Sequence, residues 1–352
     1  MIRRVVLNLN HMTEKKRKRI HHLIDEYLPF VKKVINSLWN HQILAGRFCR
    51  KEHYQNIKTS LTERYKQCAA KQALQIVKSQ RKRLKRTKPT VHSPTLELDS
   101  RFSKIEEGKN TFDLWVKISI LDGRPILIPA RRHHHFNSFY NSSWRMKRSS
   151  RLRKTKKGLF LDVFFEKQSP QTKGKGRIVG LDLGFRKLAV LSDGQVIGKG
   201  LNETTKRFHK RKKSHLVISE YINQELKEID FSDIRILVIE GLKNVKKGKR
   251  GKNSRYANRL LSHWAYRHAL FRLEMLCEEN RVQLMSVNPR GTSKACNKCG
   301  GKGIRRDERF MCPECGWKVD ADYNAALNIR DRFILRGVYG PLSKSHFDIP
   351  FG

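Results

Sequence analysis

Three acidic residues stand at the edges of apolar segments, where a carboxylate has to be solvated, paired or bound to a cation. Asp182 lies in VGLDLG, Glu240 ends RILVIE, and Asp322 opens the helical segment of VDADYNAA. Carboxylate oxygens are ligands that Mg²⁺ accepts readily. Two such ions about 4 Å apart can support in-line attack on a phosphodiester. We therefore predict that Asp182, Glu240 and Asp322 converge on a magnesium site that hydrolyses nucleic acid.

Each of these acids, taken singly, also has a purely structural explanation. An Asp at a helix start is commonly an N-cap, and an acid before Gly is commonly part of a turn. Asp320 could also take the place of Asp322 as a ligand. The Lys/Arg runs at 206–213 and 243–252, on either side of Glu240, favour the metal-site interpretation because they could line a groove for a phosphate backbone.

Four cysteines have the spacing C-x2-C-x12-C-x2-C, and a glycine follows each pair. Each short loop points two thiolates inward, so that two loops together can bind one tetrahedral zinc ion. Protein fills all four coordination positions, which leaves none for a reacting water. We therefore predict a structural Zn²⁺ held by Cys296, Cys299, Cys312 and Cys315.

A run of three histidines, His133 to His135, also resembles a metal cluster. Consecutive side chains cannot easily face one ion, and no suitable acid or cysteine lies close by in the sequence. We interpret this run as a solvated or RNA-facing basic segment rather than a metal site.

The chain of 352 residues carries 76 Lys and Arg against 32 Asp and Glu, a formal net charge of +44. So large an excess repels itself unless a polyanion neutralises it, and it predicts a nucleic-acid partner. We find neither an apolar run that could span a bilayer nor a secretory leader. Cys49, Cys68 and Cys277 are scattered and form no even disulfide framework, so we expect a reducing, intracellular compartment.

The two halves of the chain predict different secondary structure, and the elements of the second half should position the candidate residues. In the first half, apolar residues at helical spacing in 20–38 and 57–77 predict an antiparallel helical pair, with Pro29 kinking or splitting the first helix. Short alternating segments between 94 and 170 then predict a small β-sheet or barrel.

In the second half, RIVGLDLG and KLAVLSDGQVIG predict a β-meander that carries Asp182. RILVIE and VQLMSV predict buried strands, and helices are expected around 214–228, between Leu261 and Leu276, and from Asp322 to Phe333. The three acids are thus expected on two strands and a helix.

The second half resembles the RuvC-like nuclease of the TnpB family, to which compact type V CRISPR effectors are closely similar. The resemblance covers 177–332 and rests on four blocks in the family's order, GLDLG, VIEGL, NPRGTSKACNKCG and FMCPECGWKVDADYNAALNI. It implies an RNase H-like fold, with Asp182, Glu240 and Asp322 at the catalytic positions, Mg²⁺ between them, and guidance by an RNA. Arg290, in the NPRGTS segment, is expected to contact a phosphate or to have a structural role.

The first half is similar to the family's wedge and recognition modules in architecture only. The resemblance implies an α+β and α/β multidomain chain: a wedge-like β-barrel (1–10 and 90–172), a helical recognition insertion (11–89), a RuvC-like nuclease (173–290 and 319–335), a zinc ribbon (291–318) and a C-terminal tail (336–352). Asp182 and Glu240 lie closer together in sequence than is usual in the family, which indicates a shortened helical segment between them.

These observations predict an RNA-guided DNA endonuclease that recognises a short motif beside its target, pairs a guide RNA with the DNA and cuts it with two Mg²⁺ ions. Its partners would be guide RNA and double-stranded DNA, and we expect a monomer in the cytoplasm of a bacterium or archaeon, associated with the nucleoid. Two alternatives remain open: an RNA-guided DNA-binding regulator without cleavage, and a guide-independent RuvC-like nuclease.

Overall fold

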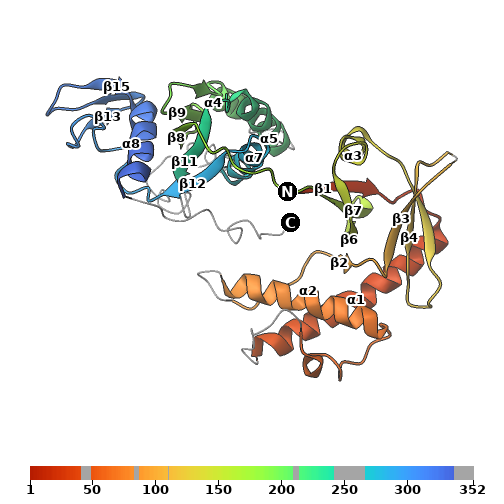
Figure 1. Cartoon of the computed structure of the whole chain (residues 1–352). Coiled ribbons are helices and arrows are strands. Elements are labelled where there is room, and N and C mark those ends of the chain that lie inside the picture. Colours follow the sequence, from red (N-terminus) through yellow and green to blue (C-terminus); the bar gives the residue numbers. More distant parts are fainter. Residues whose placement is uncertain (41–48, 83–86, 110, 209–213, 242–265, 337–352) are drawn as a thin grey trace. The chain divides into compact units, whose positions relative to one another are not determined.

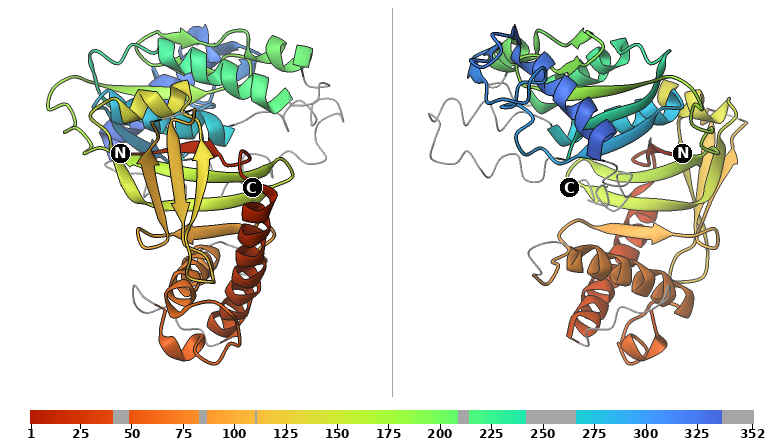
Figure 2. Two further views of the ribbon diagram at one scale, coloured as in Figure 1. Left: turned by 90° about the vertical axis from the view of Figure 1, so that its right-hand side faces the viewer. Right: turned by 60° about the vertical axis from the view of Figure 1, so that its left-hand side comes forward.

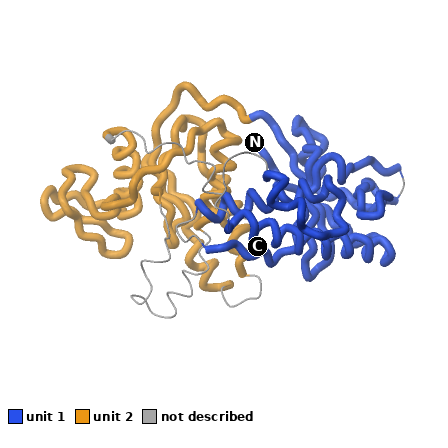
Figure 3. Tube along the Cα trace, turned by 90° about the horizontal axis from the view of Figure 1, so that it is seen from below, with its two compact units in different colours: residues 1–168, 350–352 blue, residues 169–349 orange. Residues whose placement is uncertain are grey.

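The computed structural model describes residues 1–40, 49–82, 87–109, 111–208, 214–241 and 266–336. The chain divides into two compact units, the first comprising Met1–Gln168 and the second beginning at Ser169 (Figure 3). The fold is mixed α/β with several sheets, as the sequence predicts. The predicted C-terminal tail lies almost entirely outside the described residues, as do 209–213 and all of 243–252 from the two basic runs.

The first unit contains a helical pair, α1 (Glu14–Asn40) and α2 (Glu63–Arg81), joined by a segment that includes η1 (Lys51–His53). Helix α1 continues through Pro29 without being split. Nine buried side chains, from Ile20 to Leu38, follow one face of the helix on both sides of the proline. Packing of this face against the core offsets the hydrogen bond that Pro29 cannot donate.

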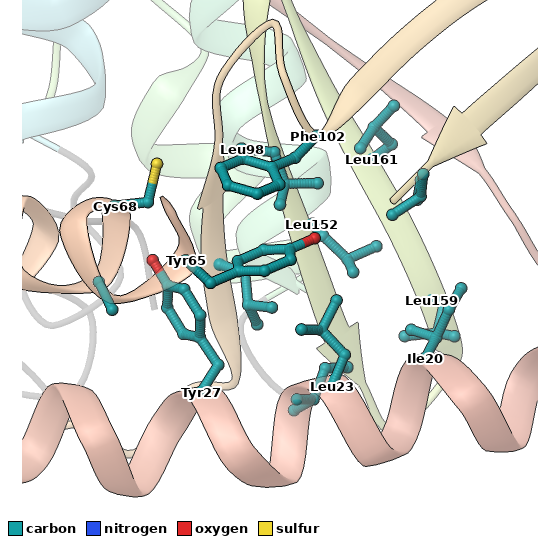
Figure 4. Packing of buried hydrophobic residues seen from close by; sticks show 14 of the residues in the cluster. Ile20, Leu23, Tyr27, Tyr65, Cys68, Leu98, Phe102, Leu152, Leu159 and Leu161 are labelled. Carbon is teal, nitrogen blue, oxygen red and sulfur yellow. The ribbon is translucent and has the colours of Figure 1, made fainter. Parts of the chain in front are cut away.

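The two helices run in the same direction, so the prediction of an antiparallel pair is wrong. Tyr27 on α1 contacts Tyr65 near the start of α2, and Arg81 at the end of α2 donates to the carbonyl oxygens of Leu38 and Trp39, 3.1 and 2.9 Å away, at the end of α1 (Figure 4). The connection returns along α1, where Thr59 Oγ1 donates to Glu26 at 3.0 Å. Helical periodicity specifies the buried face but not the direction, and this connection is long enough to run back.

The strands of the first unit form two separate antiparallel sheets. The first has the order β1-β7-β6-β2 and the second the order β3-β4-β5. Their bounds are β1 Ile2–Asn8, β2 Thr95–Leu98, β3 Ser103–Glu107, β4 Leu114–Ile118, β5 Ile126–Ala130, β6 Arg145–Thr155 and β7 Gly158–Glu166. Within the described residues neither sheet closes on itself, so the predicted barrel is corrected to two open sheets. Alternation predicts strands, but closure depends on pairing between the edge strands β1 and β2, which the sequence pattern does not specify.

One hydrophobic core joins the helices and both sheets of the first unit. Figure 4 shows Ile20 and Leu23 of α1 beside Leu152 and Leu159 of the four-stranded sheet. The ring of Tyr65 stacks on Phe102 with centroids 3.9 Å apart, which ties α2 to the loop between β2 and β3. Both helices and both sheets of the first unit therefore contribute side chains to this core.

The second unit is built on a five-stranded sheet of order β10-β9-β8-β11-β12 (Figure 1). The strands β8, β9 and β10 are antiparallel neighbours, whereas β11 is parallel to β8 and β12 is parallel to β11. Their bounds are β8 Arg177–Leu183, β9 Ala189–Leu191, β10 Val196–Ile197, β11 Ile234–Glu240 and β12 Gln283–Val287. The predicted meander and both buried strands are confirmed.

Helices cover both faces of this sheet. One face packs against α4 (Leu201–Phe208), α5 (Ser214–Glu225), η2 (Leu226–Glu228) and α7 (Tyr266–Glu279) through side chains such as Leu181 and Ile239. The opposite face, with Ile236 and Val238, packs against Ile329 of α8 (Ala321–Arg336), which lies across the sheet in Figure 2. Side chains alternate along a strand, so every second residue of β8 and β11 faces α8.

Between β12 and α8 the chain forms a small three-stranded sheet of order β13-β14-β15. Its strands are β13 Ile304–Arg306, β14 Arg309–Met311 and β15 Lys318–Asp320. A separate small hydrophobic core packs around this sheet and consists of Cys296, Phe310, Cys312 and Ala321. In the described part of the chain, no helix has both the length and the apolar character needed to cross a membrane.

A candidate metal-dependent active site and a four-cysteine centre

The sheet of the second unit brings two of the predicted acids side by side. Strands β8 and β11 are parallel, and their register pairs Leu181 with Ile239. Asp182 and Glu240 follow these two residues directly, and laterally paired residues of parallel strands project to the same face. Both carboxylates therefore project toward α8, from the ends of neighbouring strands.

Gly180 allows α8 to approach this face closely. A Cβ atom at position 180 would lie 2.1 Å from the carbonyl oxygen of Ala326 and 2.6 Å from the amide nitrogen of Arg330, so no other residue fits without moving the helix. Asp322 lies one helical turn before Ala326, as Asp182 lies two residues beyond Gly180. The close packing thus places the first turn of α8 over the strand ends.

Asp182 shows the electrostatic effect of this arrangement. Burial, together with the neighbouring carboxylates of Glu240 and Asp322, raises the pKa of Asp182 from 3.8 to about 8. Within the described residues, its carboxylate has no hydrogen-bond or ion-pair partner. A half-buried acid beside two other acids is a site of uncompensated negative charge, which a divalent cation would neutralise.

The other two acids of the site, Asp322 and Glu240, are held by hydrogen bonds. Asp322 is 7% exposed, and its Oδ1 accepts a hydrogen bond of 2.7 Å from Nη2 of Arg305 on β13. Glu240 accepts a hydrogen bond from the hydroxyl of Thr292, and burial raises the pKa of Glu240. The roles of Arg305 and Thr292 could not be predicted from the sequence. Residue spacing does not show how the sheet β13-β14-β15 packs against the strand ends.

Asp320, the alternative to Asp322, has a structural role. Its Oδ1 accepts hydrogen bonds from the backbone amides of Asp322 and Tyr323, at 3.0 and 3.1 Å, as an N-cap of α8 does. Its Oδ2 contacts Nζ of Lys187, which follows β8. Both oxygens of Asp320 are therefore engaged, and Asp322 is the acid that projects toward Asp182.

The four cysteines gather as the spacing predicts. Their sulfur atoms all lie within 4.8 Å of one another, with Cys296 to Cys315 at 3.6 Å and Cys299 to Cys312 at 3.5 Å. Tetrahedral zinc with bonds of about 2.3 Å separates sulfurs by about 3.8 Å, so the cluster fits this ion. The amide of Cys315 lowers the pKa of Cys312 to about 7, whereas burial raises the pKa of Cys296. Zinc would have to displace protons from the cluster as it binds.

The two candidate centres differ in compactness. In the described residues, the four cysteines are the only group of three or more potential ligands whose atoms lie within 4.8 Å of one another. Two of the three acids are bound to protein partners, Asp322 to Arg305 and Glu240 to Thr292. The carboxylates fit Mg²⁺ by chemistry and charge, and their role as ligands stays a prediction.

Two other predicted features have structural places. The amide of Arg290 donates to Oδ1 of Asn288 at 3.0 Å in a turn, and its side chain is exposed. His133 caps α3 (His134–Tyr140) and lies 3.0 Å from the carbonyl oxygen of Val6. The interpretation of the three histidines as a basic segment stays a prediction.

The raised pKa of Asp182 makes a prediction about stability. The ionised carboxylate is disfavoured in the folded chain, so the stability associated with its protonated form is present below pH 4 and is lost as the pH rises toward 8. Asp182→Asn keeps the side chain neutral, and we expect it to melt several degrees higher than the wild type at pH 8 in buffer without added Mg²⁺, since 1 kcal/mol corresponds to about 2–4 °C.

The measurement is thermal melting from pH 4 to pH 8, with Asp233→Asn as the control. Asp233 is an exposed acid paired with Arg177, so its replacement brings no such gain. An advantage of Asp182→Asn that does not grow with pH would contradict the electrostatic account.

Part of the second unit matches a known protein family. Residues 266–329 match the family model described as the Cas12f1-like TNB domain. This range covers α7, β12, the four cysteines and the first half of α8. This part of the chain is therefore similar to a Cas12f1-like TNB domain. Asp322, Thr292 and Arg305 all lie within the matched range, whereas Asp182 and Glu240 lie outside it on the sheet.

Curated relatives extend the similarity beyond the TNB domain. Over 97 residues, 25% of the chain, it is 32% identical to the CRISPR-associated endodeoxyribonuclease Cas12f1 of an uncultured archaeon, of which it covers 18%. Over 118 residues, 32% of the chain, it is 34% identical to a TnpB-like protein of Aquifex aeolicus (strain VF5), of which it covers 38%. The matched stretches span less than two fifths of either relative. The predicted resemblance to TnpB and compact type V effectors is confirmed.

A solved structure extends the likeness to the fold of the whole chain. The Cas12f1 chain of a Cas12f1–sgRNA–target DNA complex superposes with a TM-score of 0.62 at 15% identity. The match covers 90% of this chain and 83% of that one. The regions flanking the TNB domain therefore share the fold of a Cas12f1 chain.

Proposed function

We propose that this chain is an RNA-guided DNA endonuclease that hydrolyses phosphodiesters at Asp182, Glu240 and Asp322. The observation that carries the proposal is the convergence of these acids from β8, β11 and α8, with burial and mutual repulsion raising the pKa of Asp182 to about 8. Such uncompensated charge in a polar site is costly to a fold and is typical of functional sites.

The strand order of the second unit supports an RNase H-like, RuvC-type nuclease. Three antiparallel strands are extended by two parallel ones, and two of the acids lie on the central pair β8 and β11. We assign 173–290 with 319–335 to this nuclease and 291–318 to a zinc ribbon. We assign 1–10 with 90–172 to a wedge and 11–89 to a recognition module, both without a closed barrel.

Mg²⁺ bound by the three carboxylates would activate water and stabilise the charge of the phosphodiester in the transition state. The chain's own contribution is to hold the carboxylates in one place through the register of β8 with β11 and the close packing at Gly180. Arg305, which donates to Asp322, is placed to bind a phosphate oxygen when DNA enters. The cysteines would hold Zn²⁺ in a purely structural role.

Guide RNA and DNA are proposed as partners because two observations agree. The net charge of +44 calls for a polyanion, and the structurally similar Cas12f1 is described in complex with sgRNA and target DNA. In this proposal base pairing reads the target, and the protein reads a short motif beside it. The protein would act in the bacterial or archaeal cytoplasm.

The test begins with purification of the chain expressed from its own locus and sequencing of the RNA that co-purifies. We expect one structured RNA with a variable end, and Mg²⁺-dependent cleavage of plasmids that carry a matching target beside one motif from a randomised library. Guided binding without cleavage would instead indicate a regulator. Cleavage by RNA-free protein at the same rate would indicate a guide-independent nuclease.

A further inference from the structure

The hydroxyl of Thr292 contacts Glu240, one of the three acids of the candidate active site. Thr292 is 1% exposed and precedes the first cysteine pair by four residues. Its Oγ1 donates to Oε1 of Glu240, and it also lies 3.0 Å from the carbonyl oxygen of Pro289. A hydroxyl has a single proton, and the carboxylate oxygen is both the closer and the more strongly accepting partner.

The turn before Thr292 is fixed to α8 by one arginine. Nη1 of Arg332 donates to the carbonyl oxygens of Asn288 and Arg290, at 2.6 and 2.8 Å. Gly291 has a φ of +84°, in the left-handed region where glycine is favoured, so the turn can reverse directly before Thr292. The backbone that enters Thr292 is therefore held at two carbonyl groups.

The backbone around and beyond Thr292 is fixed to the same helix by two asparagines. Nδ2 of Asn328 donates to the carbonyl oxygens of Thr292 and Ala295, both at 2.8 Å, and Nδ2 of Asn324 donates to Ala295 at 2.9 Å. Oδ1 of Asn324 accepts from the amide of Asn297 at 3.0 Å. Asn324 is fully buried, so these bonds are shielded from water.

Helix α8 thus carries Asp322 at its first turn and, within the following three turns, the side chains that fix the backbone around Thr292. The hydroxyl of Thr292 in turn reaches across to Glu240 on β11. Asp322 and Glu240 are therefore linked inside the protein by helix α8 and by the hydrogen bonds from Asn328 to Thr292 and from Thr292 to Glu240. Groups behind a metal ligand set its orientation and commonly change metal affinity by 10–100-fold.

We propose that Thr292 is a positioning residue, whose hydroxyl holds the Glu240 carboxylate in the orientation that binds the catalytic divalent cation. The proposal rests on the proposed function, since it takes Glu240 to be a ligand. It assigns a task to the NPRGT segment that is separate from zinc binding: the turn presents one hydroxyl to the acid at the end of β11.

The experiment compares Thr292→Val, which keeps the volume and removes the hydroxyl, with Thr292→Ser, which keeps the hydroxyl. Thr292→Ala is measured beside them in case valine disturbs folding. Binding of Mn²⁺ by the nucleic-acid-free protein is followed by electron paramagnetic resonance, and guided cleavage is measured across Mg²⁺ concentrations. Zinc content and melting temperature report on the fold.

We expect Thr292→Val and Thr292→Ala to bind Mn²⁺ about tenfold or more weakly, and to need correspondingly more Mg²⁺ for half-maximal cleavage. Thr292→Ser should stay within about threefold of the wild type in both measurements, and zinc content should not change in any variant. Equal Mn²⁺ affinity in all variants would overturn the proposal, as would a serine variant as weak as the valine one. A wild type that neither binds Mn²⁺ nor cleaves would instead refute the proposed function.

Discussion

Asp182→Asn is expected to lower the rate of guided cleavage to less than about one thousandth of the wild-type rate while leaving guided binding of the target intact. A metal site contributes several kcal/mol of transition-state stabilisation, and each 1.36 kcal/mol is a factor of ten in rate. Asn keeps the size of the side chain but removes the carboxylate, whose pKa burial and the neighbouring Glu240 and Asp322 raise to about 8. Glu240→Gln and Asp322→Asn should have similar effects.

The measurement is single-turnover cleavage of a matched target, with target affinity determined by mobility shift on the same preparations. Asp233→Asn is the matched control, because it makes the same chemical change at an exposed acid of the same unit. Retained affinity with lost cleavage would show that the proposed catalytic site and the proposed binding of nucleic acid are separable. A variant that cleaves at the wild-type rate would remove its residue from the metal site.

Cys312→Ser is expected to lose zinc and to destabilise the second unit. Cys312 is fully buried in the small core with Phe310, and structural zinc sites contribute folding free energy directly, about 10–16 kcal/mol in small peptides. The consequence should reach the active site, because Thr292 and Arg305 flank or belong to the ribbon and contact Glu240 and Asp322. Cleavage should therefore fall together with zinc content.

Zinc is measured by its release to a chromogenic chelator and stability by thermal melting. Cys49→Ser serves as the control, since Cys49 is a partly exposed thiol of the first unit with no part in the cluster. Full zinc retention together with wild-type melting in Cys312→Ser would contradict the assignment of a structural zinc site.

The cysteines gather as their local spacing predicts, whereas the three acids were singled out by their places at strand and helix ends together with the family resemblance, and their role as ligands stays a prediction. An acid at the end of an apolar strand and a repeated C-x2-C pair can both be recognised from neighbouring residues, without knowledge of the tertiary fold. Thr292 and Arg305 could not be predicted in this way. Their roles depend on which side of the small sheet meets β11 and α8, and residue spacing carries no information on that docking.

The first unit was predicted less well, for physical reasons. The direction of α2 relative to α1 depends on the path of the connection, which helical periodicity does not describe. Strand β6 carries no clear apolar alternation in the sequence, because Met146 and Leu152 are its only apolar residues. The fold pairs two of its arginines with acids on neighbouring strands, Arg151 with Glu97 at 2.6 Å and Arg153 with the fully buried Asp162 at 2.7 Å. From the sequence alone, such arginines are expected to be exposed to solvent. In the folded sheet they form ion pairs with acids on the neighbouring strands.

The pairing of the first strand with β7 has a consequence for synthesis. Ile2 lies opposite Glu166, so β1 finds its neighbour only after more than 150 further residues have been made. At about 5–20 residues per second, the ribosome needs roughly 10–30 s to deliver them. Throughout this interval the nascent N-terminus presents an apolar strand without its partner. A ribosomal stall before residue 158 would therefore expose the chain to aggregation and degradation, whereas a pause in the second unit would leave the first free to close.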